Sequence, residues 1–160
     1  MRLYLIRHAV AVDRSAPGIL DDRSRELTPR GVQKMRRNAA ALAEIGVVVA
    51  EIWTSPLLRA RQTAEVLAQG LGFKGNARIV RALSPGGDCE QLISRLAQHP
   101  DFSGVALIGH EPDLGKLATY LLAGARQSAV EFKKGGAACI EVDDFHPPVR
   151  GRLQWLLTPK

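Results

Sequence analysis

Short apolar runs alternate along this chain with longer segments of helical periodicity, and this alternation restricts the possible folds more than any other feature. The runs expected to be strands are residues 2–6, 47–53, 77–83 and 105–108. After each of them, apolar side chains recur every three or four positions, which predicts a helix with one buried face. Alternating strands and helices typically form a mainly parallel sheet with helices on both of its faces.

Residues that favour helix ends support this interpretation. Thr28 and Pro29 are typical of an N-cap followed by a first helical residue, and Ser55 and Pro56 repeat the pattern. Asp88 can cap a third helix. The expected helices are residues 28–46, a segment from Ser55 to Gly70 or Gly72, residues 88–99 and residues 114–124.

The last two apolar segments, residues 137–142 and 152–157, predict a final strand pair. The Pro147-Pro148 pair between them indicates a turn, with His146 exposed. We therefore expect an α/β fold: a three-layer α/β/α sandwich with a mainly parallel central sheet and a late antiparallel hairpin. A chain of 160 residues can build one substantial core, so residues 1–160 are expected to form a single domain.

Charge and hydropathy limit the classes of function. The formal net charge of +6 would suit nucleic-acid binding, but the basic residues are scattered apart from short pairs such as Arg36-Arg37, and no nucleic-acid motif is present. A basic surface also attracts phosphorylated or acidic partners. Because no apolar run is long enough to span a membrane and no signal-peptide pattern is present, we expect a cytoplasmic protein without membrane partners.

Polar side chains stand at the carboxyl ends of the expected strands, where ligands bind in open α/β sheets. Arg7 and His8 follow the first strand, Arg59 follows the second, and His110 follows the fourth. The Pro85–Asp88 segment lies on the same edge. Each feature alone is also compatible with an ordinary strand end or an exposed side chain. Together, two arginines and two histidines predict a pocket for a phosphoryl group, which guanidinium groups can bind and stabilise during transfer.

Arg59 is preferred over its neighbour Arg61 for geometric reasons. Arg59 falls in the first turn of its expected helix, where the free N–H groups and the helix dipole already favour an anion. Arg61 lies about 200° further around the helix, so the two side chains cannot easily face one ligand. No spacing of Cys and His indicates a metal site, and no metal or other cofactor is expected.

These positions resemble the histidine phosphatase superfamily, which includes the cofactor-dependent phosphoglycerate mutases. The short chain, the Arg25-x-Leu27-Thr28 pattern and residues 83–88 are most similar to its SixA branch, the phosphohistidine phosphatases. The matching segments, in chain order, are Leu5-Ile6-Arg7-His8, Leu27-Thr28-Pro29-Arg30-Gly31, Ser55-Pro56-Leu57-Leu58-Arg59-Ala60-Arg61-Gln62-Thr63-Ala64 and Gly109-His110-Glu111-Pro112.

The resemblance implies a phosphohydrolase that removes the phosphoryl group from phosphohistidine in a partner protein, such as a phosphotransfer domain or a carrier protein. His8 would be the nucleophile, Arg7 and Arg59 would hold the phosphoryl oxygens, and His110 would stabilise the transition state. Arg25 would contribute to substrate binding. Water would then hydrolyse the phosphoenzyme, without a metal or another cofactor.

Two features depart from the family pattern. Ala9 replaces the usual Gly after the histidine, and because Ala is strained at a positive φ we expect a negative φ there. Larger relatives supply a general acid from an insertion, but only about fifty residues separate Arg59 from His110, and a strand and a helix are expected to fill most of them. By position alone, the candidate acids are Asp88, Asp21, Asp22 and Glu26.

The missing acid favours one substrate class. An imidazole leaving group has a conjugate-acid pKa near ~6.5 and departs with less assistance than an alkoxide. A shallow site walled by the polar loop 10–27 would also admit a protein side chain. The alternatives are a small-molecule phosphomonoesterase or mutase of the same superfamily, and a phospho-binding module without turnover.

Overall fold

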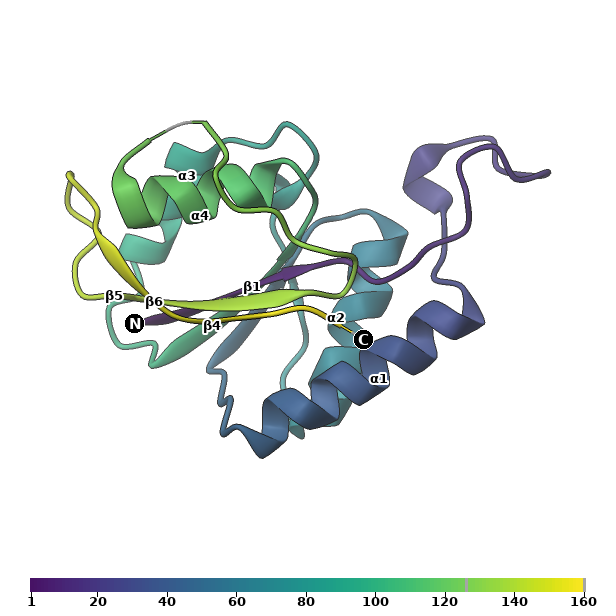
Figure 1. Cartoon of the computed structure of the whole chain (residues 1–160), viewed down its shortest axis with the longest axis horizontal. Coiled ribbons are helices and arrows are strands. Elements are labelled where there is room, and N and C mark those ends of the chain that lie inside the picture. The colour runs from purple at the N-terminus through teal and green to yellow at the C-terminus, as the bar shows by residue number, and fades with distance from the viewer. Residues whose placement is uncertain (126, 160) are drawn as a thin grey trace.

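A mixed sheet of six strands runs through the centre of the molecule (Figure 1). The computed structural model describes residues 1–125 and 127–159. The strand order is β3-β2-β4-β1-β5-β6; the first four strands in this order are parallel, and β5 and β6 form the antiparallel hairpin. The strands are β1 (Arg2–Arg7), β2 (Glu51–Thr54), β3 (Arg78–Ile79), β4 (Gly104–Gly109), β5 (Ala137–Val142) and β6 (Gly151–Leu157).

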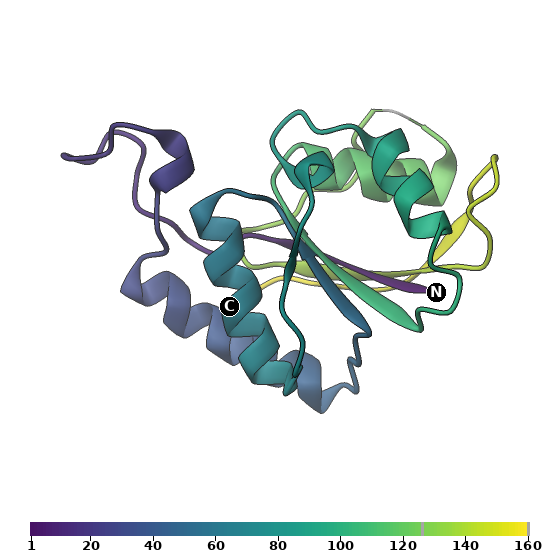
Figure 2. The same ribbon diagram turned by 180° about the vertical axis from the view of Figure 1, so that it is seen from behind.

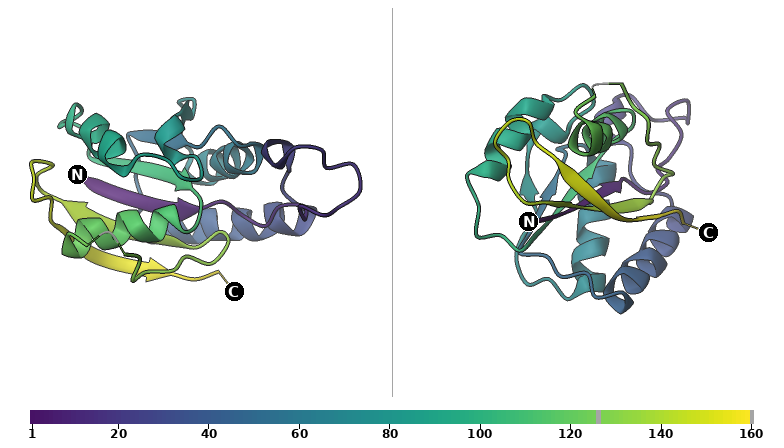
Figure 3. Two further views of the ribbon diagram at one scale, coloured as in Figure 1. Left: turned by 90° about the horizontal axis from the view of Figure 1, so that it is seen from above. Right: turned by 60° about the vertical axis from the view of Figure 1, so that its left-hand side comes forward.

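Helices cover both faces of the sheet, with α1 and α2 on one side and α3 and α4 on the other (Figures 2 and 3). In β1, Leu3 and Leu5 pack into the core beneath α3 and α4, whereas Tyr4 and Ile6 pack into the core against α1 and α2. The expected three-layer sandwich is therefore confirmed. The helices are α1 (Pro29–Glu44), α2 (Leu58–Leu71), α3 (Cys89–Ala97) and α4 (Asp113–Ala123). Among the described residues, none of the helices combines the length and the apolar character needed to cross a membrane.

Several helix ends lie where the sequence predicts them. The Thr28 hydroxyl accepts a hydrogen bond from the Gly31 N–H at the start of α1, and the Asp88 carboxylate accepts bonds from the first turn of α3. Gly46, just beyond α1, has a φ of +78°, and Gly124 closes α4 with a φ of +69°. These are left-handed conformations that favour Gly, which explains why the helices stop there.

Other boundaries were predicted wrongly. The strand expected over 77–83 is only Arg78–Ile79, and a 3₁₀ turn, η2 (Arg81–Leu83), replaces the rest. The strand expected over 47–53 is β2, which begins at Glu51 and extends to Thr54. The third helix ends at Ala97, two residues before the expected end at His99, whose ring is half-buried against Trp53 and Phe102.

The second helix begins later than predicted. Its first residue is Leu58, and its N-cap position is Leu57, which provides no side-chain hydrogen bond. Ser55 and Pro56 therefore lie in the turn between β2 and α2. Ser55 is fully buried in this turn, and its hydroxyl accepts a hydrogen bond from the Leu57 N–H.

The segment between β1 and α1 projects from the carboxyl end of the sheet (Figure 1). Its two ends are joined, because the Val12 N–H donates to the Glu26 carbonyl and the Thr28 N–H donates to the Val10 carbonyl. Near its tip, a 3₁₀ turn, η1 (Asp22–Ser24), folds back toward α2, and the tip itself carries the fully exposed Leu20.

Gly31 allows the two ends of this segment to come close enough to be hydrogen-bonded. A Cβ at Gly31 would lie 2.0 Å from the Val10 carbonyl oxygen, far inside van der Waals contact. We predict that Gly31→Ala lowers the free energy of unfolding by about 1–3 kcal/mol, the usual cost of overpacking. Urea denaturation measures this change, with Gln33→Ala on the exposed face of the same helix as the control. Helix propensity alone would stabilise the Gly31→Ala protein by about 1 kcal/mol, and that result would contradict the prediction.

Candidate active site

The pairing of β1 with β4 brings His8 and His110 together. The strands are parallel, with Arg7 opposite Gly109, and the His8 N–H donates to the Gly109 carbonyl at 3.0 Å. Each histidine is the first residue after its strand, so the two rings lie with their centroids 5.0 Å apart. Both are almost completely buried, with 6% and 3% of their surfaces exposed.

Arg59, the second residue of α2, lies against His8. Its Nε lies 3.3 Å from Nε2 of His8, and only 4% of its surface is exposed. Thr63, one turn further along α2, donates to the Arg59 carbonyl and accepts a hydrogen bond from the Ala9 N–H, which ties the helix to the segment after β1. Arg61 is exposed, so the expected choice between the two arginines agrees with the structure.

Arg7 is held from the other side of the sheet. Its Nη1 donates to the Phe132 carbonyl at 2.6 Å, and the Phe132 N–H donates to the Glu111 carboxylate at 2.9 Å. Its Nε is buried and, in the described part of the chain, has no hydrogen-bond partner. The charge of Arg7 lowers the pKa of His8, as does that of Arg59, after the larger effect of burial.

The hydrogen bonds of His8 determine which ring nitrogen carries the proton: Nδ1 faces the Ala9 carbonyl, and Nε2 accepts a bond from Nε of Arg59. Nδ1 lies 2.7 Å from the Ala9 carbonyl oxygen, which can only accept, so Nδ1 carries the proton and Nε2 carries the lone pair. Burial lowers the pKa of His8 to about 4, against the opposing effect of the Ala9 carbonyl. His8 is therefore a neutral imidazole near pH 7. Ala9 has a negative φ, as expected, because no residue other than Gly has a positive φ in the described chain.

His110 is held by Ser55. Nε2 of His110 lies 2.8 Å from the Ser55 hydroxyl, and its Nδ1 is buried without a hydrogen-bond partner among the described residues. Burial, followed by the charges of His8 and Arg59, lowers the pKa of His110 to about 3. The site therefore holds two neutral imidazoles beside permanently charged guanidinium groups.

Asp22, on η1, is the carboxylate that balances these charges. Its Oδ2 lies 3.1 Å from Nη2 of Arg59, and its backbone carbonyl accepts from Nη1 of Arg59 at 2.8 Å. Its Oδ1 accepts from Arg25 at 2.8 Å and from Arg14 at 3.1 Å. Burial alone would raise the pKa of Asp22, but the three arginines lower it to about 2. Arg25 thus meets the cluster of Arg7, His8, Arg59 and His110 through Asp22, and among the described residues it makes no hydrogen bond to either histidine.

A tetrahedral oxyanion suits this arrangement. The guanidinium groups of Arg7 and Arg59 supply positive charge and N–H donors, and His8 supplies an unprotonated nitrogen beside them. In the described residues, no three His, Cys, Asp or Glu side chains gather as the ligands of a metal ion would.

Comparison with known proteins assigns the family. The model of the histidine phosphatase superfamily (branch 1) matches residues 3–102 of this chain. The chain belongs to the histidine phosphatase superfamily. This membership and the relatives named below support a phosphohydrolase.

Individual relatives of this superfamily cover nearly the whole chain. An uncharacterised protein of Picosynechococcus sp. is 36% identical over 140 residues, covering 85% of this chain and 82% of that protein. The phosphohistidine phosphatase SixA of Escherichia coli K12 is 29% identical over 162 residues, covering 99% and 94%. The solved structure of the protein histidine phosphatase SixA complexed with tungstate superposes with a TM-score of 0.87 at 27% identity, covering 99% and 97%.

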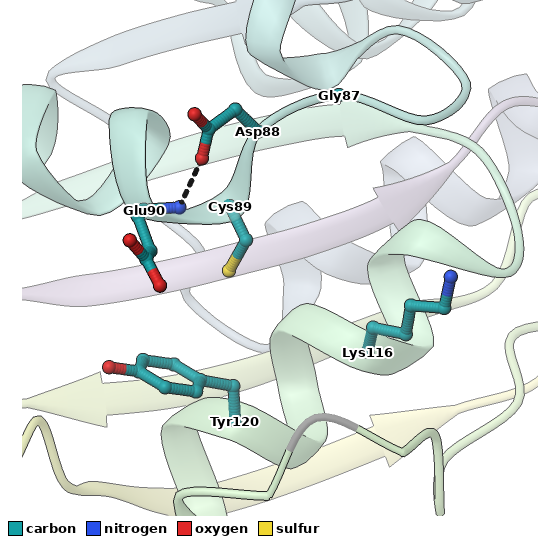
Figure 4. Close-up of a pocket in the computed structure, with 6 residues that line it drawn as sticks. All are labelled: Gly87, Asp88, Cys89, Glu90, Lys116 and Tyr120. Carbon is teal, nitrogen blue, oxygen red and sulfur yellow. Dashed lines mark hydrogen bonds between the residues drawn. The ribbon is translucent and has the colours of Figure 1, made fainter.

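Of the four carboxylates considered as general acids, only Asp22 reaches the cluster. Asp88 caps α3 through its bonds to the Glu90 and Gln91 N–H groups. It lines a separate hollow of about 380 Å³ between the start of α3 and the Lys116 and Tyr120 side chains of α4 (Figure 4). Asp21 accepts a bond from the N–H of its own turn, and Glu26 is exposed. In residues 85–88, Asp88 thus acts as a helix cap away from the histidines, whereas Pro85 lines the hollow that contains Asp22 and Gly87 lines a hollow beside His110.

Sequence reasoning missed the residues that position the histidines and arginines. Ser55 was interpreted as a helix cap, although its place at the end of β2, beside β4, could have suggested its contact with His110. Glu111 follows His110 directly, yet its contact with Phe132 joins segments more than twenty residues apart, and no local pattern indicates it.

The protonation state of His8 and His110 can be tested directly. Since burial disfavours the imidazolium ion, we expect the ring resonances of His8 and His110 to remain those of neutral imidazole as the pH falls through 6.5. An ¹H–¹⁵N NMR titration, assigned with His8→Gln and His110→Gln, measures this.

The same shifts make stability depend on pH. The unfolded chain takes up these protons near pH ~6.5, whereas folded His8 does so only near about 4, so stability falls as the pH drops between those values. A titration midpoint for both rings near pH ~6.5 would contradict the burial that the structure gives them.

A further prediction concerns the effect of the Asp22 carboxylate on phosphate binding. This carboxylate accepts a hydrogen bond from Nη2 of Arg59, and the backbone carbonyl of Asp22 accepts one from Nη1, so the carboxylate competes with an oxyanion for one terminal nitrogen of that guanidinium group. We expect Asp22→Asn to tighten the binding of inorganic phosphate about fivefold, from the loss of about 1 kcal/mol of repulsion at a distance of ~5 Å. Isothermal titration calorimetry checks this, with Asp143→Asn, which faces Arg152 instead, as the matched control. Weaker phosphate binding in Asp22→Asn would show that the carboxylate orients Arg59 rather than competing for it.

Proposed function

We propose that this protein is a metal-independent phosphatase that removes the phosphoryl group from phosphohistidine side chains of a partner protein, through a covalent intermediate on His8. The observation that carries the proposal is the state of His8: a neutral imidazole whose unprotonated Nε2 lies 3.3 Å from the Arg59 guanidinium group and beside the His110 ring. The similarity to SixA supports phosphohistidine as the substrate class.

In the first step, Nε2 of His8 attacks the phosphorus of the substrate phosphohistidine. A bond forms between Nε2 and phosphorus, and the bond from phosphorus to the substrate ring breaks. The substrate ring reacts in the form that is protonated on its other nitrogen, so it takes the electron pair and leaves as a neutral imidazole. Arg7 and Arg59 hold the phosphoryl oxygens. A hydroxyl bond from Ser55 to Nε2 of His110 would place the proton of that ring on Nδ1, from which it can donate to the same group.

In the second step, water attacks the phosphorus of phospho-His8. The bond from phosphorus to Nε2 breaks, the products are inorganic phosphate and free His8, and the proton from water passes to solvent. The Ala9 carbonyl keeps the His8 proton on Nδ1 throughout, so the reacting nitrogen is the same in both steps.

The charge state of Asp22 supports a leaving group that needs little protonation. Three arginines hold its pKa at about 2, so this carboxylate is ionised near neutral pH and cannot donate a proton. The other carboxylates considered lie outside the cluster. An imidazole leaves without the strong acid that an alkoxide requires, since its conjugate acid has a pKa near ~6.5.

Phosphate release from a phosphohistidine peptide tests this function. We expect the wild-type protein to hydrolyse it far faster than phosphoserine peptide or p-nitrophenyl phosphate, and His8→Ala to lose at least ~10³-fold in kcat, as removal of a covalent nucleophile does. His146→Ala, in the exposed connection between β5 and β6, is the matched control and should retain full activity.

Two results would count against the proposal. Comparable or faster hydrolysis of the small phosphate esters would assign the protein to the small-molecule phosphatases of its superfamily. Full activity in His8→Ala would remove the nucleophile from the mechanism.

A further inference from the structure

Two hollows meet at Arg81 on the surface beside the cluster. One, of about 690 Å³, lies between η1 and η2, and its walls include Asp22, Arg23, Leu57 and Arg81. The other, of about 680 Å³, lies on the far side of η2 and is lined by Arg78, Arg81 and Arg95 among others. Asp22 connects the first hollow to the cluster, because it also contacts Arg59. A substrate held at His8 would therefore extend over this surface.

Two arginines of this surface are exposed and unpaired. Arg23 projects from η1 and Arg81 from η2, on opposite walls of the first hollow. In the part of the chain that the structure describes, neither guanidinium group has a hydrogen bond or an ion pair with the protein. The turns that carry them are held in place, since the backbone N–H of Arg23 donates to Asp21 and the buried Val80 and Leu83 anchor the turn around Arg81.

Neither of these two guanidinium groups is bonded to the carboxylates that the structure describes beside them. The Asp22 carboxylate is shared by Arg14, Arg25 and Arg59, and Asp21 accepts a bond from the Arg23 backbone N–H. The first hollow is lined by two arginines and two aspartates, whereas the described lining of the second contains three arginines and no carboxylate. The surface as a whole therefore carries an excess of arginine over carboxylate.

We propose that this surface, centred on Arg23 and Arg81, binds acidic side chains of the partner protein that flank its phosphohistidine. The inference rests on the proposed function, which places the phosphohistidine at His8. Exposed guanidinium groups held on rigid turns attract carboxylates over a long range and orient the partner before the phosphoryl group is engaged. They also form bidentate bonds with carboxylates, which fixes the orientation in which the partner binds.

The test uses two synthetic peptides with one phosphohistidine each, flanked by glutamates in one and by glutamines in the other. We expect the wild-type protein to hydrolyse the glutamate peptide with a kcat/KM about three- to tenfold higher, the range for two exposed ion pairs. This preference should disappear in the double variant Arg23→Gln/Arg81→Gln, and it should weaken in 0.5 M salt, on the order of a few-fold. Free phosphohistidine, which carries no flanking glutamates, should be hydrolysed equally by both proteins.

The matched control is Arg36→Gln/Arg37→Gln, an exposed pair on α1 that removes the same charge and lines neither hollow. It should keep the preference for glutamate. Equal rates for the two peptides in the wild type, or a preference that persists in Arg23→Gln/Arg81→Gln, would overturn the proposed surface.

Binding of the unphosphorylated peptides tests the proposed docking surface independently of phosphate hydrolysis. Fluorescence anisotropy should show tighter binding of the glutamate peptide to the wild type, and no difference for Arg23→Gln/Arg81→Gln. If the glutamate peptide binds more tightly in this way but neither phosphorylated peptide is hydrolysed, the proposed function is wrong and the surface stands. If both peptides are hydrolysed but bind equally, the surface is wrong and the proposed function stands.

Discussion

The candidate active site depends on the parallel pairing of β1 with β4. This register places Arg7 opposite Gly109 and so brings His8 beside His110, although the two residues are about a hundred positions apart in the sequence. A shift of one residue would turn every side chain of β1 to the other face of the sheet and separate the rings. The apolar residues Leu3 to Ile6, which alternate between the two cores, prevent such a shift.

The cost of burying this cluster explains its network of contacts. Two guanidinium groups beside two imidazoles would repel any additional positive charge, and the histidines accordingly remain neutral. Asp22 lies against Arg59 and supplies the opposite charge from a loop whose two ends are joined to each other. The same loop carries Arg23 to the rim, so one segment balances the charge of the site and contributes to the proposed docking surface.

The layers of the fold were predictable because buried parallel strands and amphipathic helices have strong local patterns. The four residues of the cluster were predictable because each lies at the end of a strand or in the first turn of a helix, and the carboxyl ends of parallel strands meet at one edge. The ends of β3 and α2 could not be predicted, since the turn η2 continues the apolar pattern of a strand with Ala82 and Leu83, and the Ser55-Pro56 pair resembles a helix start. The contact between Asp22 and Arg59 could not be predicted, because a loop of this length has no periodicity that fixes where its side chains lie.

The central claim is that His8 accepts the phosphoryl group on Nε2. The most direct measurement is NMR of the intermediate, trapped by rapid mixing with a phosphohistidine peptide and transfer to alkaline solution, where phosphohistidine survives. Correlation of ³¹P with the ring nitrogens should place the phosphorus on Nε2 of His8, because the Ala9 carbonyl holds the proton on Nδ1. A label on Nδ1 of His8, on His110, or on no residue of the protein would contradict this account.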